Sequence, residues 1–328
     1  MNAAGRLGVY GAALVLIFGG AFAAGSAFVP DATVAARQQP APSGHESTPH
    51  ASTPHESTPH ESTPHESTGP DHGGGGEHPT AQAETETLRG LSLAQDDLVL
   101  GPVTTPTKVG KAGELSFTVL GADGKPFTDF AVSHEKELHL IVVRSDGQHF
   151  EHVHPTMDPQ TGTWSVPWTW TEAGTYRVFT DFVPSGENAP NVTLTRTVEV
   201  AGDVTPRPAT AVRRTDTVGG YQVSLSGDLA AGESRELTLE VTRNGRPVTT
   251  LQPYLGAFGH LVALREGDLA FLHVHAEGED PAPGATAGPA ISFAAEAPTA
   301  GRYLLYLDFQ VDGTVHTASF VLDAHNHN

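Results

Sequence analysis

The chain contains no cysteine among its 328 residues. This absence excludes disulfide bonds, thiolate zinc sites, blue-copper sites and a cysteine nucleophile. Only two methionines are present, so a bound metal ion must be held mainly by histidine and carboxylate groups. Basic residues are scarce as well, 18 against 38 acidic ones. An acidic surface repels nucleic acid and attracts cations, and we expect no nucleic-acid partner.

Aromatic residues make up only 7% of the chain, whereas glycine (36) and proline (25) are abundant. This composition favours short strands joined by many turns, and therefore an all-β protein. A Gly-x-Ser-x-Gly elbow and a phosphate-binding glycine loop are both absent from the sequence, so we expect no enzyme. A three-histidine zinc site with an open position leaves hydrolysis as a weaker possibility.

Charged residues are missing from Leu7 to Val29, a run of 23 residues. Such a run is long enough to cross a bilayer, and we expect residues 1–30 to form a signal anchor that leaves the bulk of the chain outside the cell membrane. The small residues Gly25, Ser26 and Ala27 keep cleavage by a signal peptidase open, in which case the protein is secreted.

Large apolar residues are nearly absent from residues 31–88, where a His-Glu-Ser-Thr-Pro unit recurs. A segment of this composition cannot bury enough surface to offset chain entropy, so we expect a disordered stalk. Its regularly spaced histidines suit weak capture of divalent cations, although a plain spacer remains an alternative. These histidines are His45, His50, His55, His60, His65, His72 and His78.

The rest of the chain contains one pattern twice. Asp123-Gly124-Lys125-Pro126 matches Asn244-Gly245-Arg246-Pro247 at an offset of 121 residues. Three histidine pairs keep this offset, and after an added loop Ala-Gly-x-Tyr and Asp-Phe recur at an offset of 127. The matched residues are His139 with His260, His152 with His273, His154 with His275, Tyr176 with Tyr303, and Asp181 with Asp308.

Each copy is read as a series of short strands separated by turn signals. This pattern predicts two immunoglobulin-like β-sandwich domains, over residues 89–203 and 212–325. Residues 204–211 contain Pro206 and Pro208 and lack periodicity, which predicts a short, stiff linker.

A hairpin is predicted around Asp146-Gly147, which favours a two-residue type I′ turn. Its register places His139 opposite His154 and Ile141 opposite His152. Because strand side chains alternate, the three histidines share one face, close enough to converge on one metal ion.

The second copy repeats the pattern around Gly267-Asp268, which predicts His260 opposite His275 and Val262 opposite His273. Asp181 and Asp308 are candidate fourth ligands or acceptors for an imidazole N–H, and a purely structural role is almost as reasonable. The predicted metal residues are His139, His152, His154, Asp181, His260, His273, His275 and Asp308.

Residues 138–155 and 254–275, each followed by the Ala-Gly-x-Tyr and Asp-Phe elements, resemble actinobacterial exported YtkA-like proteins of immunoglobulin-like fold that are described as heavy-metal-associated. More loosely, His-x-His with aspartate in a β-sandwich is similar to the copper site of CopC-type carriers, although no N-terminal histidine completes that site here. The resemblance implies copper.

The leading hypothesis is a carrier or buffer of a divalent metal ion outside the cell membrane, with one His-x-His site per domain. Cu(II) comes first and Zn(II) or Ni(II) next, because imidazole binds all three and intrinsic affinity favours copper. The partners would be the metal ion, the membrane through the N-terminal helix, and a metal-accepting protein. The alternative is a structural or adhesive surface protein whose histidines are incidental.

Overall fold

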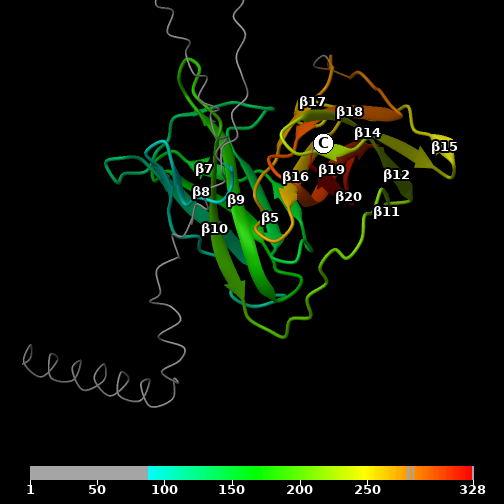
Figure 1. The fold of residues 1–328 in the computed structure, drawn as a ribbon. Helices are drawn as coiled ribbons and strands as arrows, with labels where there is room; N and C mark the ends of the chain where they lie inside the picture. The colour runs from blue at the N-terminus through cyan, green and yellow to red at the C-terminus, as the bar shows by residue number, and fades with distance from the viewer. Residues whose placement is uncertain (1–87, 279–280, 283, 327–328) are drawn as a thin grey trace, which may run out of the picture. The chain divides into compact units, whose positions relative to one another are not determined.

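The described part of the protein is built from β-strands alone. A computed structural model describes residues 88–278, 281–282 and 284–326, and within them it contains twenty strands and no helix (Figure 1). None of these described residues forms a helix long and apolar enough to cross a bilayer. The expected anchor over residues 1–30 and nearly all of the expected stalk over 31–88 lie outside the described residues.

The first half of the described chain forms two sheets that enclose one core. The first sheet has the order β1-β2-β3-β8-β7, and the second has the order β10-β9-β5-β6 with β4 paired to β9. Buried side chains from both sheets, among them Phe117, Trp164, Leu140 and Val178, form a single cluster. The strands are β1 (Ala94–Gln95), β2 (Leu98–Leu100), β3 (Gly113–Leu120), β4 (Phe130–Ala131), β5 (His139–Arg144), β6 (Glu151–Val153), β7 (Thr156–Asp158), β8 (Thr163–Trp168), β9 (Gly174–Pro184) and β10 (Val192–Val200).

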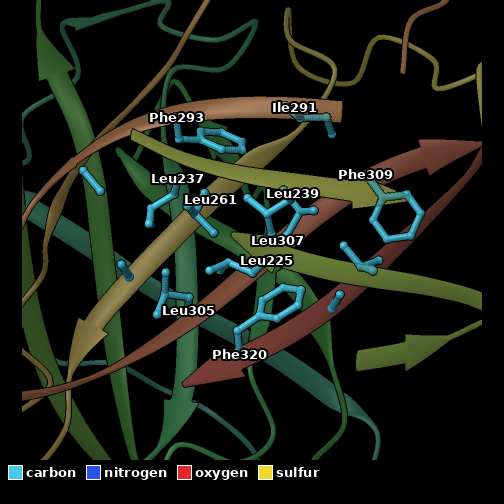
Figure 2. Packing of buried hydrophobic residues seen from close by; sticks show 14 of the residues in the cluster. Leu225, Leu237, Leu239, Leu261, Ile291, Phe293, Leu305, Leu307, Phe309 and Phe320 are labelled. Atoms are coloured by element: carbon cyan, nitrogen blue, oxygen red, sulfur yellow. The ribbon is translucent and has the colours of Figure 1, made fainter. Parts of the chain in front are cut away.

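The second half repeats this arrangement. One sheet has the order β11-β12-β14-β18-β17, with β15 paired to β14, and the other has the order β13-β20-β19-β16. Figure 2 shows how Leu239, Phe293, Leu307 and Phe320 fill the space between the two sheets. The strands are β11 (Thr215–Val218), β12 (Tyr221–Ser226), β13 (Leu229–Ala230), β14 (Ser234–Arg243), β15 (Arg246–Pro247), β16 (His260–Arg265), β17 (His273–Ala276), β18 (Ala290–Glu296), β19 (Gly301–Val311) and β20 (Thr314–His325).

The duplication seen in the sequence is also a duplication of structure. β16 begins and ends 121 residues after β5, and β19 begins and ends 127 residues after β9. In both copies the histidine that opens the strand pairs with an aspartate, His139 with Asp181 and His260 with Asp308. The repeated tyrosine has one role in both copies, because the hydroxyl donates to a carbonyl four residues earlier in each. We refer to the two copies as the first and second sandwich.

The two sandwiches belong to one compact unit and share an apolar seam. Side chains of β5 and β9 pack there against side chains of β16 and β19, for example Ile141 and Phe179 with Val262 and Tyr306. A second tie runs along the loop between β5 and β6, where Phe150 stacks on Tyr306 with ring centroids 4.0 Å apart. The outer face of the sheet that carries the predicted histidines is thus covered by the second sandwich.

Candidate metal centre

Three histidines of the first sandwich come together on the hairpin formed by β5 and β6. Leu140 pairs with Val153, Ile141 with His152 and Val142 with Glu151, which is the register expected from the sequence. His139 opens β5, and His154 follows the last residue of β6. Alternation along both strands therefore turns His139, His152 and His154 to the same face of the hairpin.

The connecting turn differs from the expected two-residue type I′ turn. Gly147 N donates to Arg144 O at 2.8 Å and Arg144 N donates to Gln148 O at 2.9 Å, so three residues form the loop. Gly147 has a φ of +80° and Asp146 does not have a positive φ, as in a type I turn followed by a left-handed glycine. The Asp146 carboxylate binds the buried Arg144 guanidinium at 2.8 Å, and this ion pair holds Asp146 in the turn.

A one-residue bulge restores the predicted register. Between the Arg144–Gln148 pair and the Val142–Glu151 pair, β5 has one residue and the returning chain has two, of which His149 has a φ of +55°. A shift of one residue would turn the side chains of β6 to the opposite face. The bulge therefore keeps His152 and His154 on the side of His139.

The three rings converge on a small volume. His139 Nδ1 lies 3.1 Å from His152 Nε2 and 3.1 Å from His154 Nε2. Among the described residues, His139, His152 and His154 form the one group of three or more potential ligands whose donor atoms all lie within 4.8 Å of one another. Metal–nitrogen bonds of about 2.0–2.1 Å in a tetrahedral site place ligand nitrogens about 3.3 Å apart. The observed spacing is close to what a single ion requires.

Hydrogen bonds on the far sides of two rings fix their tautomers. His139 Nε2 lies 3.2 Å from the Ser133 carbonyl oxygen, which only accepts, so Nε2 carries the proton. His152 Nδ1 lies 2.8 Å from Asp308 Oδ2, so Nδ1 carries the proton of that ring. When both rings are neutral, the unprotonated Nδ1 of His139 and Nε2 of His152 face each other across 3.1 Å. Both nitrogens are then free to bind one metal ion between them.

Burial favours the neutral form of two of the three rings. Burial first, and the neighbouring His152 second, lower the pKa of His139 to about 3. Burial is also the main reason that the pKa of His154 falls to about 3. The neutral imidazole is the form that binds a metal ion directly, so burial keeps these two rings in their ligating form.

The two predicted aspartates occupy matching positions but have different partners. Asp308 is 3% exposed, accepts from His152 Nδ1, and accepts from Thr317 Oγ1 at 2.5 Å. Asp181 accepts from Thr193 Oγ1 at 2.6 Å and Asn191 Nδ2 at 2.8 Å, and burial raises its pKa. Asp308 thus contacts the back of a triad ring, while Asp181 is held by an amide and a hydroxyl.

In the described residues, the backbone pairing expected for His260 with His275 and for Val262 with His273 is not formed. The predicted register exists only near the loop, where Leu264 bridges Phe271 and Leu272 N donates to Ala263 O at 2.8 Å. The chain then leaves β16, and β17 pairs with β18, which places the backbone of His273 opposite Glu296 and that of His275 opposite Ala294. This pairing packs Val274 against the second core and leaves His275 exposed.

His260 is nevertheless close to the first triad. Its Nε2 donates to Tyr254 O at 2.7 Å, which repeats the bond from His139 to Ser133. Its ring centroid lies 6.4 Å from that of His152 and 5.5 Å from that of His134. Burial lowers the pKa of His260 to about 4. His134 precedes β5, and the sequence carries no signal that the second sandwich brings His260 to this place.

These rings line a cavity of about 320 Å³ at the seam. Residues of both sandwiches contribute to its wall, including Phe258, Phe271 and Val274 from the second. Two of the three triad residues, His139 and His152, line this cavity. Its ionisable lining residues are His134, His139, His152, Asp181, His260, His275 and Glu277.

The fold and the site together define a class of protein: two all-β sandwiches in tandem, with a partly buried three-histidine cluster at the seam between them. The chain belongs to the family described as domain of unknown function DUF8832, whose model matches residues 97–202 and 216–326. The two matched segments correspond to the two sandwiches, so the family domain occurs twice. No curated protein matches the chain.

Solved structures similar to the chain include invasin, a bacterial integrin-binding protein, with 12% identity, a TM-score of 0.21, and coverage of 69% of this chain and 38% of that one. Domains 5–6 of the S-layer protein SbsC show 14% identity, a TM-score of 0.21, and coverage of 70% and 100%. Fibronectin(III)-like modules of Clostridium thermocellum CbhA show 12% identity, a TM-score of 0.18, and coverage of 70% and 95%. Likenesses of this degree carry no argument about function.

Proposed function

We propose that the protein binds one divalent metal ion through His139, His152 and His154 and serves as an extracytoplasmic carrier or buffer rather than as an enzyme. The observation that carries the proposal is the convergence of three imidazole nitrogens, with His139 Nδ1 3.1 Å from both His152 Nε2 and His154 Nε2. This spacing is close to the separation of about 3.3 Å between nitrogens that bind one tetrahedral ion.

Copper is the first candidate for the ion. Three neutral imidazoles bind Cu(II), Ni(II) and Zn(II), and intrinsic affinity is highest for Cu(II). The resemblance to exported copper carriers points the same way, and the formal net charge of −20 favours the approach of any cation. Export, membrane anchoring and capture of ions by the N-terminal histidine repeat belong to the same proposal, as does a protein that accepts the metal.

The test is a competition titration of the full chain with Cu(II) and with Zn(II), using a chelator to separate tight from weak binding. The variant carries His139→Gln, His152→Gln and His154→Gln, which keep a polar group in each position. It should lose one tight equivalent relative to wild type, because the histidines outside the triad are the same in both proteins. The matched control is His149→Gln, on the same hairpin but hydrogen-bonded to Thr171 and Arg207.

Equal tight binding by wild type and the triple variant would contradict the proposal. The alternative, an adhesive or structural surface protein, would then become the leading hypothesis. The same titration tests the number of sites. The duplication alone suggests two triads of equal affinity, and in that case the triple variant would still bind one tight equivalent.

A further inference from the structure

The two sandwiches contain the same aspartate and threonine arrangement at the same place. Asp181 lies on β9 and accepts from Thr193 of β10, and Asp308 lies on β19 and accepts from Thr317 of β20. In each case the aspartate pairs across the sheet with the histidine that opens the neighbouring strand. The duplication therefore provides two carboxylates that differ only in their surroundings.

The two carboxylates differ in their second hydrogen-bond donor. Asp181 accepts from the side-chain amide of Asn191, a residue of its own sandwich. Asp308 accepts from His152 Nδ1, which belongs to the other sandwich. The side chains of His152 and Asp308 are each only 4% exposed, so this contact is shielded from water. A shielded imidazole–carboxylate hydrogen bond is strong and directional.

The hairpin that carries the triad is docked on the strand that carries Asp308. Tyr306 of β19 donates its hydroxyl hydrogen to the Gly147 carbonyl at 2.7 Å and stacks on Phe150. Tyr306 and Asp308 are two residues apart on β19, so their side chains project from the same face of the strand. One face of the second sandwich thus holds both the turn of the hairpin and one ring of the triad.

We propose that Asp308 of the second sandwich is a positioning residue for the metal site of the first, so that the second sandwich orients a ligand instead of carrying an ion of its own. This inference rests on the function proposed above. Asp308 fixes His152 as the Nδ1–H tautomer, directs Nε2 at the ion, and increases the electron-donating strength of that nitrogen. Metal binding is then linked to the docking of the two sandwiches.

The test compares Asp308→Asn with Asp181→Asn in the full chain, with Cu(II) and Zn(II) as probes. Both substitutions are nearly isosteric and remove one buried carboxylate charge. Asp308→Asn should weaken metal binding about 10–100-fold, the usual cost of losing the partner of a metal-bound histidine. It should also change the electron paramagnetic resonance spectrum of bound Cu(II). The hydrogen-bond partners of Asp181 are Asn191 and Thr193 and not a triad ring, so Asp181→Asn should weaken metal binding less than Asp308→Asn does.

A second measurement keeps the proposal testable if Asp308→Asn does not fold. Long-range ¹H–¹⁵N correlation spectra of the Zn(II)-bound wild type should show His152 with its proton on Nδ1. A proton on Nε2 would overturn the inference, and so would unchanged affinity and spectrum in a folded Asp308→Asn variant. If wild type binds no more tight metal than the triple histidine variant, the proposed function fails and this inference fails with it.

Discussion

At the level of single residues, the unusual feature is how many neutral imidazoles the seam encloses. His139 is 7% exposed, and both His139 and His154 have a pKa near 3, while that of His260 is about 4. An unfolded chain would hold each of these groups at a pKa of about 6.5. The folded protein therefore binds fewer protons than the unfolded chain once the pH falls below about 6.5.

This difference predicts that the metal-free protein loses stability as the pH falls. Above about pH 6.5 the three rings are neutral in both states and contribute no pH dependence. Between about pH 6.5 and pH 4 only the unfolded chain takes up protons at these rings, so the free energy of unfolding should decrease steadily, and the loss should level off below about pH 3. Urea unfolding of the metal-free protein at several pH values measures the slope.

The double variant His139→Gln, His154→Gln provides the control for that slope. It removes two of the three rings, so the free energy of unfolding should depend less steeply on pH between pH 6.5 and 4 than in wild type. An identical slope would show that these rings are accessible to protons in the folded state.

At the level of elements, the sequence contained the information for β5 and β6 but not for β17. Alternation between Leu138 and Arg144 and the Asp-Gly pair predicted the strand, the hairpin and the face shared by the triad. The observed three-residue loop contains an ion pair between Arg144 and Asp146, a contact that strand and turn preferences do not reveal. The predicted register of β5 and β6 is nevertheless correct, because the one-residue bulge offsets the one-residue difference in the turn.

The second copy shows why sequence periodicity cannot choose between two neighbouring strands. The predicted pairing with β16 and the observed pairing with β18 both satisfy the alternation of His273, Val274 and His275. The choice is made by tertiary packing, since pairing with β18 places Val274 against the second core. The contact of His152 with Asp308, 156 residues away, could likewise not be predicted from the sequence, because it depends on how the two sandwiches dock.

The turn of the hairpin provides a prediction at this level. Gly147 has a φ of +80°, and a Cβ added there would clash with Leu304 Cδ1 of the second sandwich. Gly124 has a φ of +74° and open space around it. Gly124→Ala should lower the free energy of unfolding by about 1–2 kcal/mol, the cost of a left-handed backbone for alanine. Gly147→Ala should cost about 1–3 kcal/mol more, because Leu304 must move in a packed seam.

Urea unfolding of the two variants gives the comparison directly, since the backbone cost is common to both. Equal losses of stability would mean that the hairpin does not press against Leu304, and the docking described here would be wrong. A larger loss for Gly147→Ala should come with weaker metal binding, because the displaced hairpin carries His139, His152 and His154.

At the level of the whole molecule, the segment between the sandwiches is tied to both of them. Residues 204–211 were expected to be a stiff linker. The hairpin holds the segment through Asp146 Oδ2, which accepts from Arg207 N at 2.7 Å, and the second sandwich holds it through Arg302, which donates to Ala209 O at 3.1 Å. Together with the apolar seam, these contacts predict that the sandwiches unfold as one cooperative unit when the metal site is filled.

The distribution of tryptophan makes that cooperativity measurable. All three tryptophans, Trp164, Trp168 and Trp170, are buried in the first sandwich, so their fluorescence reports on that half, whereas circular dichroism reports the strands of both. Zn(II) at about one hundred times its dissociation constant should stabilise the folded state by about 2.7 kcal/mol and move both signals together to a higher midpoint. In Asp308→Asn the shift should shrink at the same Zn(II) concentration, because the affinity falls. If Zn(II) raised the fluorescence midpoint while part of the circular dichroism signal stayed at its metal-free midpoint, the ion would stabilise the first sandwich alone and the proposed link through Asp308 would be lost.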